Sequence, residues 1–235
     1  MFSEKRKIRY SHLSPSGAVR MSEILRFVQD AAVMHTAQCG YPIDKLYKEH
    51  SAWILLSIHL VEVKTVLCSE ISVKTWPYDF SKVFGPRAFL ICDANTDEVL
   101  IKGSALWTFV DTESGRPKPI PSEMIDNFGT EDKACDVPFI RRLPNHVTES
   151  SAITFSVLKR DLDTNGHMNN VRYLEYAEEV LPEEFSFTEF EIFYKQPLFL
   201  GDSFSVSVKK LEDETQVVNI KNSNDDICTY VRFIP

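Results

Sequence analysis

The sequence predicts an α+β protein of two tandem modules, each a long helix packed on an antiparallel sheet. Three observations predict this fold class: an apolar helical stripe occurs twice, β-rich segments follow each stripe, and the two halves match in sequence. At an offset of 149 residues, GAVRMSEILRFVQD of residues 17–30 lies over GHMNNVRYLEYAEE of residues 166–179. EISV of residues 70–73 also resembles DSFSV of residues 202–206, at an offset near 132. Two matches in the same order favour a duplicated module over chance.

The first module is assigned to residues 1–112. A short strand over Lys7–Tyr10 precedes a helix that Gly40 and Pro42 end. The residues on one face of this helix are Ile24, Leu25, Val28, Ala31, Ala32 and His35. We interpret His35 as a buried core histidine rather than a ligand. The strands predicted after the helix are Trp53–Lys64, Glu70–Trp76, Arg87–Cys92 and Val99–Val110.

Residues 113–148 are interpreted as a linker, because they hold five of the twelve prolines. One short helix is expected near Ser122–Phe128. The second module then covers residues 149–235 and begins with a strand over Ile153–Leu158. Its helical stripe consists of Val171, Leu174, Ala177 and Leu181, and Pro182 ends it. The strands that follow are Phe187–Tyr194, Phe204–Val208, Gln216–Ile220 and Thr229–Ile234.

Composition narrows the class of function. A hydrophobic fraction of 43% with 26% charged residues is that of a globular protein and excludes disorder. The net charge of −8 argues against a nucleic-acid partner. No apolar stretch approaches the ~18–20 residues of a membrane span, and the polar N-terminus is not a secretory signal. Five scattered cysteines indicate neither a disulfide framework nor a zinc site, so we expect a cytoplasmic protein without cofactor or metal.

The two modules differ in the turn before each helix. The second has Asp163, Asn165 and His167 where the first has Ser14, Ser16 and Ala18. The chemistry is therefore expected in the second module. Because these three residues alternate, an extended stretch would place them on one side. The alternative is a purely structural role: Asp163 to Gly166 is a good turn sequence, and Asn169 or Asn170 is a good N-cap. That alternative leaves His167 unexplained.

An acid, an amide and an imidazole beside a helix N-terminus suit acyl transfer. The imidazole can move a proton or hold a water, and the carboxylate can orient it or act as base. The amide can position a water or a carbonyl, and backbone N–H groups can stabilise an oxyanion. The sequence has no GxSxG, and no cysteine lies near these residues. A covalent acyl-enzyme is therefore not indicated.

The segment DLDTNGHMNNVRYLEY of residues 161–176 resembles the active-site segment of plant and bacterial acyl-acyl carrier protein (acyl-ACP) thioesterases. Their pattern is Asp-x-Asn-x-His-x-x-Asn, and the resemblance covers roughly residues 5–233, including the strand with Trp53. It implies a double hot-dog fold and hydrolysis of fatty acyl-ACP to free fatty acid and holo-ACP. It also implies that Asp163, Asn165 and His167 are the catalytic set.

One position departs from this family. The family often has a further Glu in a Tyr-x-x-Glu context, where this chain has Tyr194-Lys195-Gln196-Pro197. Glutamine can bind a water but cannot take its proton, so Asp163 or His167 would be the only base. The residues expected to bind substrate are Asn169, Asn170, Gln196 and Trp53, with Leu56 and Ile58 as further candidates for the wall of an acyl tunnel.

The implied partner is an acyl carrier protein. The basic pair Lys159-Arg160, just before the polar residues, is our candidate for its docking site, and the alternative is an ordinary solvated surface pair. The chain is expected to act as a monomer or homodimer, since two fused modules already satisfy the pairing of hot-dog folds. Three alternatives stay open: a thioesterase for acyl-CoA, a non-catalytic acyl-binding module, and a dehydratase for 3-hydroxyacyl thioesters.

Overall fold

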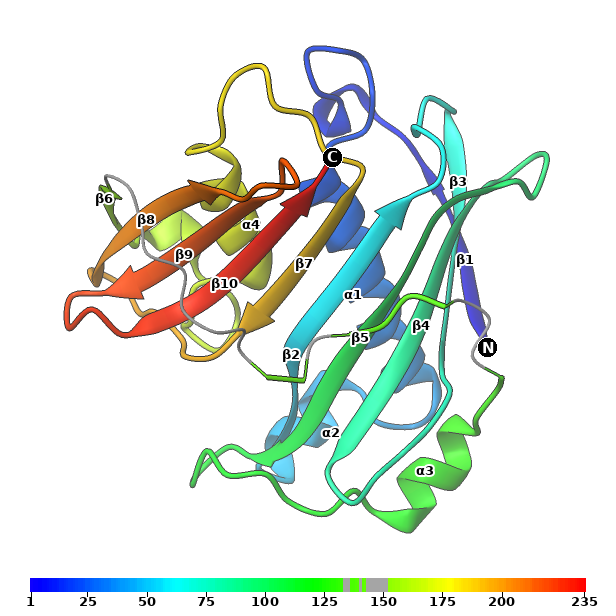
Figure 1. Cartoon of the computed structure of the whole chain (residues 1–235). Helices are drawn as coiled ribbons and strands as arrows, with labels where there is room; N and C mark the ends of the chain where they lie inside the picture. The colour runs from blue at the N-terminus through cyan, green and yellow to red at the C-terminus, as the bar shows by residue number, and fades with distance from the viewer. Residues whose placement is uncertain (133–135, 140, 143–151) are drawn as a thin grey trace. The chain divides into compact units, whose positions relative to one another are not determined.

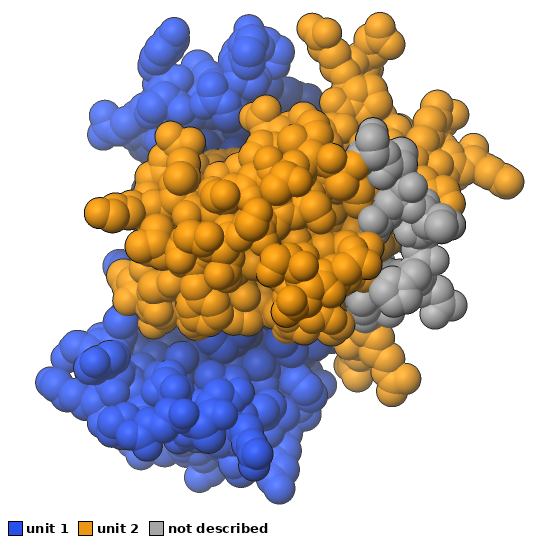
Figure 2. Space-filling view, turned by 90° about the vertical axis from the view of Figure 1, so that its left-hand side faces the viewer, with its two compact units in different colours: residues 1–139 blue, residues 140–235 orange. Residues whose placement is uncertain are grey.

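The structure, a computed structural model, describes residues 1–132, 136–139, 141–142 and 152–235. It divides into two compact units, residues 1–139 and residues 140–235, coloured blue and orange in Figure 2. Each unit has a helix that packs on an antiparallel sheet, so the predicted α+β class is confirmed (Figure 1).

Unit 1 has five strands in the order β1-β3-β4-β5-β2, and each neighbouring pair is antiparallel. Their bounds are β1 Phe2–Lys7, β2 Ser51–Glu62, β3 Glu70–Pro77, β4 Phe84–Asp93 and β5 Val99–Asp111. The helix α1, Met21–Gln38, packs on β1 and β3. A second helix, α2 over Ile43–Lys48, follows the Pro42 that was expected only to end α1. Proline has no backbone N–H to donate, so it interrupts a helix that precedes it. The same property is tolerated at a helix start, where the N–H groups have no partner within the helix.

The predicted stripe of α1 is confirmed as its buried face. Ile24, Leu25, Val28 and Ala31 have no exposed surface. Burying an Ile, Leu or Val side chain stabilises the folded state by about 1.5–3 kcal/mol, which is more than the helix propensity of one residue contributes. The helix ends two residues before Gly40, whose φ of +91° suits glycine.

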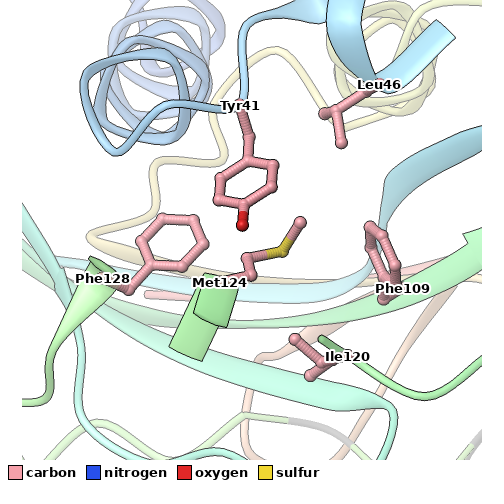
Figure 3. Packing of buried hydrophobic residues seen from close by; sticks show 6 residues of the cluster. All are labelled: Tyr41, Leu46, Phe109, Ile120, Met124 and Phe128. Carbon is pink, nitrogen blue, oxygen red and sulfur yellow. The ribbon is translucent and has the colours of Figure 1, made fainter. Parts of the chain in front are cut away.

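Much of the segment interpreted as a linker packs on unit 1. The predicted short helix is confirmed as α3, Ser122–Phe128. Its Met124 and Phe128 join a buried cluster with Tyr41, Leu46, Phe109 and Ile120 (Figure 3). Further along, the backbone carbonyl of Val137 accepts a hydrogen bond from Ser104 Oγ at 2.7 Å. Residues 143–148 of the same segment lie outside the described residues.

Unit 2 has the strand order β7-β10-β9-β8-β6, again antiparallel throughout. The strands are β6 Ala152–Ser156, β7 Glu189–Tyr194, β8 Ser203–Lys210, β9 Gln216–Asn222 and β10 Ile227–Ile234. The helix α4, Asn170–Glu178, packs on β9 and β10. It ends before Leu181, which the predicted stripe had included. Pro182 disfavours the α conformation for the residue before it, so the helix ends earlier than its apolar pattern.

The two units share their hydrogen-bond pattern as well as their order of elements. Lys7 of β1 pairs with Glu70 of β3, and Ser156 of β6 pairs with Ser203 of β8. Residues 7 and 156 differ by 149, and residues 70 and 203 differ by 133, close to the two offsets found in the sequence. The duplication is therefore visible in the register of the sheet.

The first strand of each unit differs from its prediction. β1 covers Phe2–Lys7 and shares only Lys7 with the predicted strand over Lys7–Tyr10, so that prediction is wrong for residues 8–10. β6 covers Ala152–Ser156 and ends two residues before the predicted Leu158. A single 3-10 turn follows each strand. These turns are η1, Tyr10–His12, and η2, Lys159–Asp161. Among the described residues, none of the helices is both long and apolar enough to cross a membrane.

Candidate active site

The polar residues predicted to be catalytic lie in a closed loop between η2 and α4. Leu162 and Met168 form an antiparallel bridge at the base of this loop. Above it, Asp163 N donates to His167 O at 2.8 Å, and Gly166, with φ of +76°, donates to Asp163 O at 3.2 Å. The expectation of an extended stretch is therefore wrong. Asn-Gly permits the positive φ that reverses the chain, and this local preference overrides the alternation of polar residues.

Asp163 organises the loop through its side chain. Its Oδ1 accepts the backbone N–H of Asn165 at 2.8 Å and that of His167 at 3.1 Å. The turn-forming role considered for Asp163 is thus confirmed. The other oxygen, Oδ2, has no hydrogen-bond partner among the residues that the structure describes. The Asp163 carboxylate can therefore hold the loop through Oδ1 and still accept a proton, or a hydrogen bond from a water, at Oδ2.

The side chains of the loop differ in exposure. His167 is half-buried, and its ring lies edge-on to Phe199 at 5.0 Å between centroids. The backbones of these two residues also form a β-bridge, and Met168 N donates to Leu198 O at 2.8 Å. Asn165, at the tip of the loop, is exposed. The imidazole is therefore fixed on one side by an aromatic ring, while the amide faces solvent.

The two asparagines after the loop shape the start of α4. Asn169 is the N-cap: its Oδ1 accepts Val171 N at 3.0 Å. Asn170 is the first helical residue, and its carbonyl accepts the Tyr194 hydroxyl at 3.1 Å. The N-cap alternative of the sequence analysis is thus confirmed for Asn169. The positive end of the α4 dipole lies directly after the polar loop.

The remaining predicted binding residues lie elsewhere. Gln196 follows β7, with its backbone N–H donating to Cys228 O at 3.1 Å and its side chain half-buried. Trp53 lies on β2 of unit 1, with its ring 5.1 Å from that of Phe109. Its indole Nε1 is buried and has no partner among the described residues. Substrate binding by these residues stays a prediction, as does the catalytic role of the loop.

Sequence reasoning missed two tyrosines that fasten the site. Leu198 N donates to the buried Tyr173 hydroxyl at 3.0 Å, and the rings of Tyr173 and Tyr194 meet edge-on at 5.7 Å. Burial raises the pKa of both hydroxyls, so both stay protonated at neutral pH. Tyr173 falls outside the apolar stripe, and no signal in the sequence pairs it with a residue 25 positions away.

Unit 1 has the same loop without the reactive groups. Leu13 bridges Val19, Ser14 N donates to Ala18 O at 2.8 Å, and Gly17 N donates to Ser14 O at 3.0 Å. Each of these residues precedes its counterpart in unit 2 by 149 positions. The loops therefore differ in chemistry and not in backbone hydrogen bonding. Within the described ranges, no group of three or more His, Cys, Asp or Glu side chains is arranged to hold a metal ion.

Comparison with curated proteins finds relatives of low identity. The palmitoyl-acyl carrier protein thioesterase, chloroplastic, of Cuphea hookeriana is 24% identical over 199 residues, which are 78% of this chain and 48% of that protein. The oleoyl-acyl carrier protein thioesterase, chloroplastic, of Coriandrum sativum is 21% identical over 246 residues, covering 95% of this chain and 66% of that protein. The chain spans about half the length of the first of these relatives.

Solved structures share the fold across the whole chain. The 12:0-ACP thioesterase of Umbellularia californica matches with a TM-score of 0.86 at 18% identity, covering 99% of this chain and 96% of that chain. An acyl-ACP thioesterase of Bacteroides thetaiotaomicron matches with a TM-score of 0.83 at 19% identity and the same coverage. At such identities the match concerns the fold, and it confirms the predicted double hot-dog architecture.

Family profiles cover both units. The profile described as the acyl-ACP thioesterase N-terminal domain matches residues 1–128, and the one described as the acyl-ACP thioesterase C-terminal domain matches residues 145–232. Both matches follow the order in which the two units occur in the chain. The chain therefore belongs to the acyl-ACP thioesterase family.

Proposed function

We propose that this protein hydrolyses the thioester of fatty acyl-ACP, releasing a free fatty acid and holo-ACP. The observation that carries the proposal is the asymmetry of the two loops. The two loops share the same backbone hydrogen-bond pattern, yet only the loop before α4 has an acid, an amide and an imidazole. Membership of the acyl-ACP thioesterase family supports the same reaction.

The reaction requires a water, a base and donors for the oxyanion. A water held near Asp163 Oδ2 and His167 attacks the carbonyl carbon, and one of these two groups takes its proton. The exposed amide of Asn165 can position the water or the carbonyl. Backbone N–H groups and the positive end of the α4 dipole favour the negative charge that develops on the carbonyl oxygen. The C–S bond then breaks, and the leaving thiolate takes up a proton.

The central test compares matched positions in the two loops. Hydrolysis of a panel of acyl-ACPs is measured for wild type, Asp163→Ala and His167→Ala, with Ser14→Ala of unit 1 as control. We expect each substitution in unit 2 to lower kcat by about 10²–10⁴-fold, the contribution of a positioned acid or base. The control should retain the wild-type rate. Unchanged rates in both unit 2 variants would remove the proposed site.

The carrier is a separate question with its own experiment. Lys159 and Arg160 are exposed just before the loop, where a basic pair would attract an acidic carrier. Lys159→Glu should raise KM for acyl-ACP and leave KM for the same acyl chain on CoA unchanged, whereas the exposed Lys210→Glu serves as control. An equal effect on both carriers would contradict docking of a carrier protein there. A better kcat/KM for acyl-CoA in wild type would favour the acyl-CoA alternative.

A non-catalytic acyl-binding module is the second candidate. Gln196 and Pro197 motivate it, because they leave this stretch without the carboxylate of the family pattern. Tight binding of acyl-ACP with no release of fatty acid would support this candidate. Measurable, enzyme-dependent release would exclude it.

We also propose that the protein acts in the cytoplasm, as a monomer or homodimer. Cys39, Cys68, Cys92 and Cys228 are all free thiols, which suits a reducing compartment. Cell fractionation and light scattering of the purified chain test these two statements separately.

A further inference from the structure

Asp161, two residues before the polar loop, is a buried carboxylate for which the proposed reaction has no use. Only 2% of its surface is exposed. We propose that Asp161 is a positioning residue that fixes the loop of Asp163 and His167 against α4. This inference rests on the proposed thioesterase function of the loop.

Three hydrogen bonds converge on Asp161 from both sides of the loop. Its Oδ2 accepts Leu158 N at 2.8 Å and the Tyr176 hydroxyl at 3.1 Å. Its backbone carbonyl accepts Asn169 N at 2.7 Å. Leu158 lies before the loop, Asn169 directly after it, and Tyr176 on α4. One residue therefore joins the start of the loop, the end of the loop and the helix.

Nearby arginines compensate the buried charge. Arg172 Nε lies 3.7 Å and Arg160 Nε lies 3.9 Å from Asp161 Oδ1. Arg172 also contacts Glu175 and donates from Nη2 to the carbonyl of Arg160 at 3.4 Å. Arg172 and Tyr176 are four residues apart on α4, so they share a helix face and reach the same carboxylate. The η2 turn is thus fastened to α4 by side chains as well as by the backbone.

Unit 1 shows that the backbone does not need this carboxylate. At the position equivalent to Asp161 it has His12, whose Nδ1 accepts Arg9 N at 3.1 Å and whose carbonyl accepts Arg20 N at 3.0 Å. Phe27, the counterpart of Tyr176, meets the His12 ring edge-on at 5.2 Å and offers no hydroxyl. An imidazole and a phenylalanine therefore close the same turn in unit 1. The acid and its tyrosine hydroxyl occur only beside the polar loop, which points to positioning rather than to folding.

The loop depends closely on its base. Residues 163–167 connect to the rest of unit 2 through the Leu162–Met168 bridge, the bond between Asp161 and Asn169, and the contact of His167 with Phe199. Because only Leu162 separates Asp161 from Asp163, a shift of Asp161 would displace Asp163, and the two hydrogen bonds between Asp163 and the His167 backbone would transmit that displacement to His167. Misplacing catalytic groups by about 1 Å lowers a rate by roughly 10²-fold.

The test combines kinetics with matched variants. Asp161→Ala should lower kcat on acyl-ACP by about 10²-fold and change KM by less than about threefold. Asp161→Asn keeps an oxygen acceptor and should retain kcat within about fivefold. Tyr176→Phe should give a smaller loss than Asp161→Ala. His12→Ala, at the same place in unit 1, should leave kcat unchanged.

A readout that does not depend on activity completes the experiment. Hydrogen exchange of the Asn165 and His167 amides, which donate to Asp163, should speed up by at least about tenfold in Asp161→Ala. Exchange of the Leu13 and Val19 amides in unit 1 should not change. If these loop amides exchange at the wild-type rate in Asp161→Ala, the inference is refuted whether or not the protein is an enzyme. If Asp161→Ala does not fold, the test passes to Tyr176→Phe. In that case the positioning role of Asp161 is refuted if Tyr176→Phe keeps both the amide exchange rates and the kcat of the wild type.

The two hypotheses fail in different ways. A wild type that hydrolyses no acyl thioester overturns the proposed function. A wild type that is active, is inactivated by Asp163→Ala and is unaffected by Asp161→Ala overturns only the positioning role.

Discussion

Lowering the pH is expected to destabilise unit 1 through one buried histidine. His35, 5% exposed on α1, accepts a hydrogen bond at Nδ1 from Arg87 Nη2 of β4 at 2.5 Å. The Phe128 ring lies edge-on to the imidazole at 5.5 Å. Burial, and then the positive charge of Arg87, lowers the pKa of His35 from 6.5 to about 4. The histidine is therefore neutral in the folded protein at neutral pH, as its interpretation as a core residue requires.

The sign and size of the effect follow from proton binding. Below pH 6.5 the unfolded chain protonates His35 while the folded protein does not, so the unfolded state binds more protons and stability rises with pH. The stabilisation is complete above pH 6.5 and is lost as pH falls toward about 4. A pKa difference of about 2.5 units, at 1.36 kcal/mol each, corresponds to about 3 kcal/mol.

Urea unfolding between pH 4 and pH 7.5 measures this contribution. The three tryptophans of the chain, Trp53, Trp76 and Trp107, all lie in unit 1, so their fluorescence reports the unfolding of that unit. His35→Gln keeps an acceptor for Arg87 but does not titrate. The wild type should lose about 3 kcal/mol more than this variant between pH 7 and pH 4, and the exposed His50→Gln should behave like wild type. Identical pH dependence of wild type and His35→Gln would refute the reasoning.

Three substitutions of backbone-shaping residues give further predictions. Gly103→Ala would place a Cβ 2.3 Å from Leu60 Cδ2 on the neighbouring strand, so a loss of more than about 2 kcal/mol is expected in urea unfolding, and a loss below 0.5 kcal/mol would contradict this packing. Asn169→Ala removes the N-cap that accepts Val171 N and should lower the stability of unit 2 by about 1 kcal/mol, measured by thermal unfolding followed by circular dichroism. Gly166→Ala forces a side chain into a φ of +76° and should cost about 1 kcal/mol; because its Cβ would meet no atom within 4 Å, a much larger loss would exclude strain as the cause.

The residues of the candidate site could be predicted from the sequence, but their conformation could not. Comparison of the two helix starts pointed to Asp163, Asn165 and His167, because the equivalent positions of the first module have no acid, amide or imidazole. Alternation of these residues gave the wrong local conformation, because the loop closes through Asp163 accepting two backbone N–H groups. Such bonds form only once Gly166 reverses the chain. The N-cap at Asn169 was predictable, since capping depends on residues within three positions.

The local elements of this protein and its internal repeat could be predicted from the sequence alone. The local elements include the apolar face of α1, most of the strands in both units and the short helix over residues 122–128, and each depends on residues a few positions apart. The repeat is visible when the two halves of the sequence are aligned with each other.

Tertiary structure alone decided which side chains meet across long separations. His35 lies beside Arg87, 52 positions away, and Tyr173 beside Leu198, 25 positions away. It also decided that Asp161 is buried and bonded to Tyr176. Burial and pairing of this kind arise from the packing of a helix on a sheet, which no local pattern encodes, and they set the charge state of His35 and the attachment of the polar loop to α4.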